Sequence, residues 1–80
     1  MPKLRVVSGR QLVKFFEKQG FELEYGKGSH CKMIKFVGEQ IQELAIPLHK
    51  EIARGTLKAI FSQAAHFIPV EELRKYFYTK

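Results

Sequence analysis

The hydrophobic pattern of this chain changes from a helical period to a strand period at Gly20. Leu12, Phe15 and Phe16 recur at the spacing of one helix face, whereas Phe21–Tyr25 alternates strictly between apolar and acidic side chains. Glycine often ends a helix, because it adopts the left-handed conformation without steric cost. A helix that passes directly into a half-buried strand predicts a fold that mixes both kinds of element.

The first helix also carries a start signal. Ser8 and Gln11 have the spacing of a capping box, and Val7 and Leu12 have that of a hydrophobic staple. We therefore expect the helix to begin directly after Ser8. Residues 1–7 are expected to form a short extended lead-in.

Two glycine-containing turns divide the next stretch into three strands. Gly26–Ser29 is expected to form a hairpin turn, since its two glycines adopt positive φ readily. The second strand then covers His30–Val37, and Gly38-Glu39 turns the chain into a weaker third strand over Gln40–Ile46. The alternation breaks within residues 34–37, which indicates either a bulge or a strand that is covered on both faces.

Two more helices are expected in the C-terminal third. The first begins near Gly55-Thr56 with Thr56 as N-cap, residues 67–69 interrupt it, and Val70–Tyr78 forms a short last helix. This order predicts an α+β two-layer sandwich, α-β-β-β-α with a short C-terminal helix, in which the two main helices cover one face of an antiparallel sheet. The double-stranded-RNA-binding domain has the same order of elements, which is an analogy of fold and not of function.

The length and composition limit the class of protein. A chain of 80 residues is expected to form one domain over residues 1–80. The single cysteine excludes an internal disulfide, so nothing requires an oxidising compartment. No long apolar run predicts a transmembrane helix, and the N-terminus has no signal-peptide pattern, so a cytoplasmic location without membrane contact is expected.

The charge favours an anionic partner. The formal net charge is +6, and the stretch between Glu24 and Glu39 holds Lys27, Lys32 and Lys35 without any acidic residue. Such a balance favours nucleic acid or an acidic protein as partner. The chain has no aspartate, and its eight acidic residues are scattered glutamates. The glutamates give no cluster for a two-metal nuclease site, and the separations of the three histidines follow no recognised metal-ligand spacing. We therefore expect neither a metal nor a cofactor.

Gly28-Ser29-His30 is the strongest candidate for a functional site. It brings an imidazole to the start of a strand directly after a turn, and histidine is the side chain whose ordinary pKa lies near neutrality. Lys32 is expected on the same strand face as His30, roughly 7 Å along the strand. The pair suits proton transfer at a phosphate group. The alternative is an exposed or locally hydrogen-bonded histidine without a catalytic role.

A second basic group surrounds the expected start of the second main helix. Lys50, Arg54 and Lys58 flank Gly55-Thr56, and the free N–H groups of a helix start favour phosphate. A solvated helix face explains the same residues equally well.

The remaining candidates have structural interpretations that compete with functional ones. His49 follows a proline and is expected to be a loop or capping residue, and His66 suits a helix end. Cys31 is expected to be a small buried apolar residue. Tyr25 could stack on a base beside the turn, although core packing is the simpler expectation.

Several short motifs together carry a resemblance to a known family. They are Ser8–Lys14, Gly20-Phe21, Gly28-Ser29-His30, Pro47-Leu48-His49 and Gly55–Ile60, in this order. In these motifs the chain resembles the HicA-type (YcfA-like) toxins of bacterial and archaeal toxin–antitoxin systems. Residues 69–80 are the least constrained by the resemblance.

The resemblance has consequences for fold, activity and partners. It implies the fold of a double-stranded-RNA-binding domain and the activity of a small mRNA interferase that needs no metal. The histidine of the Gly-Ser-His signature, His30 in this chain, would be the catalytic residue. The implied partner is a HicB-type antitoxin, which covers the active surface and can bind DNA to repress the shared operon.

We therefore expect a metal-independent endoribonuclease toxin that cleaves single-stranded mRNA and so inhibits translation. His30 would act as general acid or base on the ribose 2′-OH reaction, and His49 is the leading candidate for the second such group. The expected RNA-contacting residues are Lys27, Gly28, Ser29, Lys32, Lys50, Arg54 and Lys58. Two alternatives are a non-catalytic RNA-binding module and a protein-interaction domain with an acidic partner.

Overall fold

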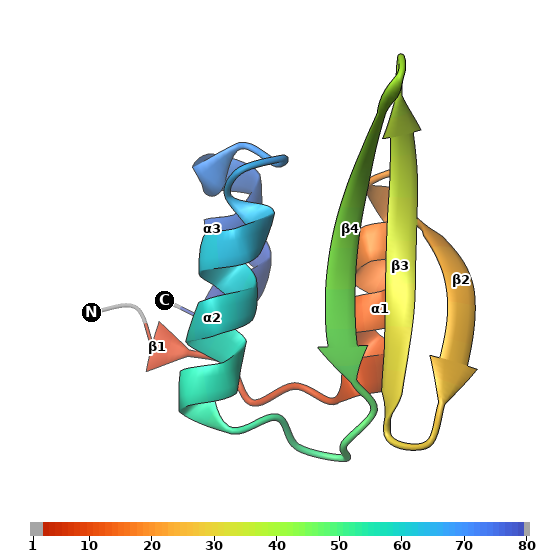
Figure 1. Cartoon of the computed structure of the whole chain (residues 1–80). Coiled ribbons are helices and arrows are strands. Elements are labelled where there is room, and N and C mark those ends of the chain that lie inside the picture. Colours follow the sequence, from red (N-terminus) through yellow and green to blue (C-terminus); the bar gives the residue numbers. More distant parts are fainter. Residues whose placement is uncertain (1–2, 80) are drawn as a thin grey trace.

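The computed structural model describes residues 3–79, apart from the side chains of Tyr25 and Lys27. Its elements follow one another as β1 (Lys3–Leu4), α1 (Gly9–Lys18), β2 (Glu22–Lys27), β3 (His30–Val37), β4 (Gln40–Pro47), α2 (Arg54–Ala64), α3 (Val70–Phe77) and β5 (Tyr78–Thr79). β2, β3 and β4 form an antiparallel sheet in that order, α1 lies behind it, and α2 runs beside β4 (Figure 1). The α+β class and the α-β-β-β-α order with a C-terminal helix are confirmed, whereas the likeness to a double-stranded-RNA-binding domain stays a prediction.

The start and end of α1 follow the sequence signals. The Ser8 Oγ accepts a hydrogen bond of 3.1 Å from the backbone N–H of Gln11, and the Gln11 Oε1 accepts one of 2.8 Å from the backbone N–H of Ser8. Gly20 follows the helix with φ of 96°. Leu12 and Phe16 are fully buried, so this face of α1 packs into the core, as predicted.

The first hairpin is tighter than the sequence predicted. β2 continues to Lys27, so the loop consists of Gly28 and Ser29 alone, and Gly28 has φ of 62°. Gly26 was expected in the turn, but it pairs with Cys31 in the ladder. A two-residue hairpin needs positive φ at its first central position, and Gly28 meets this requirement without help from the other glycine.

The irregularity in the sheet lies in β2 and not where the sequence indicated it. The register between β2 and β3 shifts between Leu23 and Tyr25, while β3 pairs with β4 continuously from His30 to Val37. The expected bulge within residues 34–37 is therefore wrong. The other expectation, a strand covered on both faces, is wrong as well, because Phe36 and Val37 are both exposed.

The second main helix begins differently from the prediction. α2 starts at Arg54 after Ala53, and no side chain caps it, so the expectation that Thr56 is the N-cap is wrong. The entry into the helix is held instead by a hydrogen bond of 2.9 Å from the Ile52 N–H to the Val7 carbonyl. Ile52 is itself buried, so core packing replaces a cap at this position.

The two ends of the chain meet in a ribbon that the sequence did not predict. Lys3 pairs with Thr79 and Leu4 with Tyr78, so β1 and β5 form a two-stranded antiparallel sheet. Figure 1 shows β1 beside α2. α3 therefore ends at Phe77, one residue earlier than expected. Within the part of the chain that the structure describes, no helix is long and apolar enough to cross a membrane.

The core fills the space between the sheet, α1 and the C-terminal helices. Cys31 and Met33 of β3 face it together with Leu44 and Ile46 of β4. The other face of β3, which carries His30, Lys32 and Phe36, is called the open face below. The predicted division of β3 into a buried and an open face is confirmed for residues 30–33.

Candidate functional site

Two exposed histidines lie side by side at one end of the sheet. His30 is the first residue of β3, and His49 follows the last residue of β4, Pro47, by two positions. Because the strands are antiparallel and His30 pairs with Pro47, the two imidazoles meet, with ring centroids 6.2 Å apart. His49 was expected to be a loop or capping residue, and it is in a loop. We also considered His49 as the possible second acid–base group, and the fold places its ring next to that of His30.

Three segments of backbone hold this pair in place. The Leu48 N–H donates to the Ser29 carbonyl over 2.5 Å, and the Gly9 N–H donates to the His49 carbonyl over 2.9 Å. A side chain on Gly9 would collide with the carbonyl of Pro47 and would come within 2.7 Å of the Leu48 Cα. The start of α1 therefore approaches the histidine loop closely only because residue 9 has no Cβ.

The Ser29 hydroxyl contacts the His30 ring. Its Oγ lies 3.2 Å from His30 Nδ1, and both side chains are exposed. A hydrogen bond at Nδ1 leaves Nε2 as the ring nitrogen that is open to a substrate. Ser29 was predicted to contact RNA, and its contact here is with the imidazole beside it.

Lys32 shares the open face with His30 and is already ion-paired. Its Nζ lies 3.0 Å from Glu43 Oε1 on β4 and 3.8 Å from Glu24 Oε1 on β2. Glu24 sits in the register shift of β2, between Leu23 and Tyr25. The sequence did not predict either pair, since both join residues from different strands.

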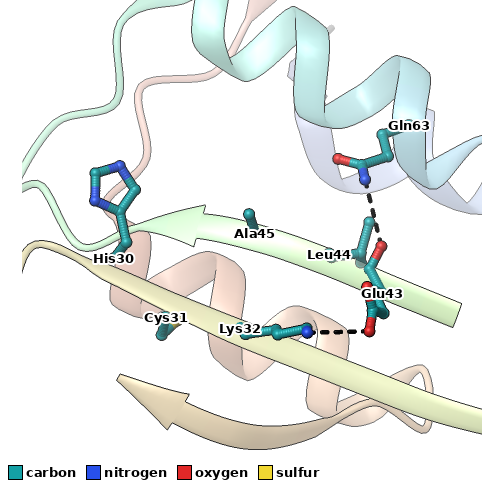
Figure 2. A pocket seen from close by; sticks show the side chains of 7 residues that line it. All are labelled: His30, Cys31, Lys32, Glu43, Leu44, Ala45 and Gln63. Atoms are coloured by element: carbon teal, nitrogen blue, oxygen red, sulfur yellow. Dashed lines mark hydrogen bonds and ion pairs between the residues drawn. The ribbon is translucent and has the colours of Figure 1, made fainter. Parts of the chain in front are cut away.

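A cavity of about 350 Å³ extends from His30 along the open face to α2 (Figure 2). Its wall toward the helix is Gln63, whose Nε2 donates to the Glu43 carbonyl over 3.3 Å. Sequence reasoning missed both Gln63 and Glu43, because only the packing of α2 against β4 brings them to the site. The residues that line it are His30, Cys31, Lys32, Glu43, Leu44, Ala45 and Gln63.

The other predicted RNA-contacting residues are distributed unevenly around the histidines. Gly28 is exposed in the hairpin loop, and Lys50 is exposed directly after His49. Arg54 and Lys58 are exposed on the first turns of α2, whereas the cavity is lined by Gln63 from the other end of that helix. The side chains of Lys27 and Tyr25, for which RNA contacts were considered, lie outside the described part of the structure.

Cys31 has the properties of a structural residue. It is 4% exposed and belongs to the core cluster, as the sequence predicted. Burial removes the thiol from water and raises its pKa above the usual value. A thiol with a raised pKa is protonated at neutral pH and is a poor nucleophile.

The side chains described by the structure contain no group of three or more His, Cys, Asp or Glu residues arranged to hold a metal ion. The functional groups at the site are two imidazoles, the Ser29 hydroxyl, the Gln63 amide, the Glu43 carboxylate and lysines.

Comparison with known proteins gives one finding. The family model described as the HicA toxin of bacterial toxin–antitoxin matches residues 9–65, which contain both histidines and every residue of the cavity. Neither the curated proteins nor the solved structures yield a match.

Proposed function

Because this chain belongs to the HicA family of toxins from toxin–antitoxin systems, we propose that it is an endoribonuclease that cleaves mRNA without a metal ion. The observation that carries the proposal is the pair of exposed imidazoles, His30 and His49, with ring centroids 6.2 Å apart beside a hairpin loop. Cleavage of RNA through its own 2′-OH requires one group that accepts a proton and one that donates a proton. Two neighbouring histidines supply both.

The proposed reaction is an internal transfer at phosphorus. One imidazole removes the proton from the ribose 2′-OH while this oxygen attacks the adjacent phosphorus and forms a new P–O bond. The bond from phosphorus to the 5′-oxygen of the next nucleotide breaks, and the other imidazole, in its protonated form, gives a proton to that oxygen. The products are a 2′,3′-cyclic phosphate and a free 5′-hydroxyl, so no further reactant is needed.

The surrounding residues would position the RNA. Ser29 would hold the His30 ring through Nδ1, so that Nε2 faces the reacting oxygen. Lys32 would hold a phosphate, although it is paired with Glu43 and Glu24. Ion pairs as exposed as these contribute about 0–1 kcal/mol each, so a phosphodiester can compete for the ammonium group. Lys50 would bind the backbone next to His49, with Arg54 and Lys58 further along.

The family implies a HicB-type antitoxin as partner. We propose that the antitoxin covers the open face of β3, including His30 and Lys32. The same face carries Phe36, which is 62% exposed, opposite Ile41 of β4, which is 55% exposed. Apolar side chains exposed together favour a protein contact. We expect the complex to cut no RNA in the assay described next.

The test is cleavage of a chimeric oligonucleotide that has one ribonucleotide in a DNA background. We expect the wild-type protein to cut it in EDTA, to leave a 2′,3′-cyclic phosphate, and to spare the all-deoxy strand. His30→Ala should lower the rate by about 10²–10⁴-fold, and His49→Ala should also lower it. His66→Ala is the matched control, since His66 is exposed beyond the end of α2 and should leave the rate unchanged.

Two outcomes would contradict the proposal. Full activity in a folded His30→Ala protein would remove its central residue, and activity that disappears in EDTA and returns with Mg²⁺ would remove the metal-free mechanism. Binding of RNA without cleavage would favour the alternative of a non-catalytic RNA-binding module.

A further inference from the structure

The cavity beside His30 has the shape and polarity of a small-molecule site. Its volume of about 350 Å³ falls within the roughly 300–1,000 Å³ of ordinary ligand pockets. Its floor is apolar and includes the methyl group of Ala45, while Lys32, its ion-pair partner Glu43 and Gln63 form a polar rim (Figure 2). A nucleobase has the same division into apolar faces and polar edges. His30, which would act on the phosphate, lines one end of the cavity. The base of a nucleotide bonded to that phosphate is therefore close enough to occupy the cavity.

The orientation of the Gln63 amide follows from its neighbour. The Glu43 carbonyl can only accept a hydrogen bond, so the group that faces it over 3.3 Å must be the amide nitrogen. The oxygen Oε1 is therefore turned the other way, and in Figure 2 it points over the cavity toward His30. An amide oxygen accepts hydrogen bonds and cannot donate them. The rim thus presents the Gln63 Oε1 as an acceptor to whatever enters the cavity.

Ala45 makes room for an occupant. It pairs directly with Lys32 across the sheet and is exposed on the open face. Residues that face each other in an antiparallel pair have Cβ atoms about 4.5–5.5 Å apart, so a larger side chain at residue 45 would fill the cavity. Because Ala45 is not part of the core, such a change tests the space without disturbing the packing.

We propose that this cavity binds one base next to the scissile phosphate and that Gln63 selects bases with an exocyclic amino group. Adenine, cytosine and guanine carry such a group, and uracil does not. The inference rests on the proposed function and adds its sequence preference. Gln63 acts as a specificity-determining residue, because its oxygen accepts from the amino group while His30 and His49 act on the phosphate.

The experiment uses the same single-ribonucleotide substrates, with cytosine or uracil as the base on either side of the cut; the sugar on the 3′ side stays deoxyribose. One neutral hydrogen bond is worth about 0.5–1.5 kcal/mol, so we expect the cytosine substrate to react about 2–12-fold faster at one of the two positions. Gln63→Leu should lower the rate on the cytosine substrate toward that on the uracil substrate. Gln40→Leu makes the same chemical change at an exposed residue at the other end of β4 and should keep the preference.

A second variant tests the space itself. Ala45→Leu should slow cleavage of every substrate, with unchanged circular dichroism. If Gln63→Leu does not fold, Gln63→Met removes the same acceptor with an unbranched side chain and takes its place.

The outcomes separate this inference from the proposed function. If the wild type cuts the substrates equally, or if Gln63→Leu retains the preference, the inference is wrong and the nuclease remains. A folded Gln63→Leu protein that cuts nothing would also overturn it, since Gln63 would then be needed for the reaction and not for selection. If the wild type cuts no RNA, the proposed function itself fails.

Discussion

The two ends of the β3–β4 hairpin share the same continuous pairing but differ in how deeply their side chains are buried. At the anchored end, residues 30–33 and 44–47, burial alternates along each strand as far as Ile46, and Cys31, Met33, Leu44 and Ile46 are all buried. At the projecting end, residues 34–43, Phe36 is 62% exposed and Ile41 is 55% exposed. The register between the strands continues unbroken through both ends.

The difference shows that strand pairing extends beyond the buried core in this fold. β2 pairs with β3 only as far as Ile34, so the projecting end continues as a two-stranded ribbon (Figure 1). Hydrogen bonds between β3 and β4 carry the ribbon past the helices, but burial requires a helix against the sheet. The histidines are at the anchored end, where three backbone segments hold them.

The largest effect expected from this comparison concerns stability. Phe16→Ala should lower the free energy of unfolding by about 3–5 kcal/mol, because Phe16 is fully buried in the core, against the rings of Phe21 and Phe77. Phe36→Ala removes the same aromatic group at the projecting end and should change it by about 0.5 kcal/mol or less. Urea titration followed by circular dichroism measures both. Equal losses would mean that the projecting end is packed in solution.

The second effect, smaller than the loss of stability, concerns RNA binding by the anchored end. In the His30→Ala background, which should bind without cutting, affinity is expected to fall as salt rises, with a slope of about −0.7 per phosphate contacted. Lys50→Ala, next to His49, should reduce the slope by roughly one contact. Lys75→Ala is the control, since Lys75 lies on α3 and pairs with Glu72 at 3.7 Å. An affinity independent of salt would favour the protein-interaction alternative.

The smallest effect concerns the buried side of the anchored end. Burial raises the pKa of Cys31, so the folded protein keeps the thiol proton at a pH where the unfolded chain loses it. Stability from this group is therefore complete below about pH 8.5 and decreases as the pH rises above that value. Cys31→Ala should make the decrease between pH 8 and 10 shallower. If both proteins lose stability in parallel, the thiol is not responsible.

The elements that were predicted correctly are determined by residues that lie close together in the sequence. The capping box at Ser8, the stop at Gly20 and the buried face of Cys31 and Met33 each depend on residues a few positions apart. The errors arose where contacts between residues distant in the sequence determine where an element begins or ends. Thr56 is not a cap because Ile52 is tied to Val7, and α3 ends early because Tyr78 pairs with Leu4.

The candidate site divides in the same way. His30 could be found from its own signature, since a glycine turn followed by an imidazole is a local pattern. The side chains that surround His30 could not be predicted from the sequence. His49 is 19 positions away and reaches it through the pairing of β3 with β4, and Gln63 comes from a helix that follows both strands. The ion pairs of Lys32 with Glu24 and Glu43 depend on all three strands.

By itself, the sequence determined the class of fold, the order of the elements and the basic charge, and it singled out the histidine that we propose as catalytic, because periodicity, turn residues and charge act over short distances. Only the tertiary structure decided which side chains surround that histidine. Side chains from β2, β4, the loop after β4 and α2 converge on the open face because helix and strand packing sets their positions, and no local pattern records that packing.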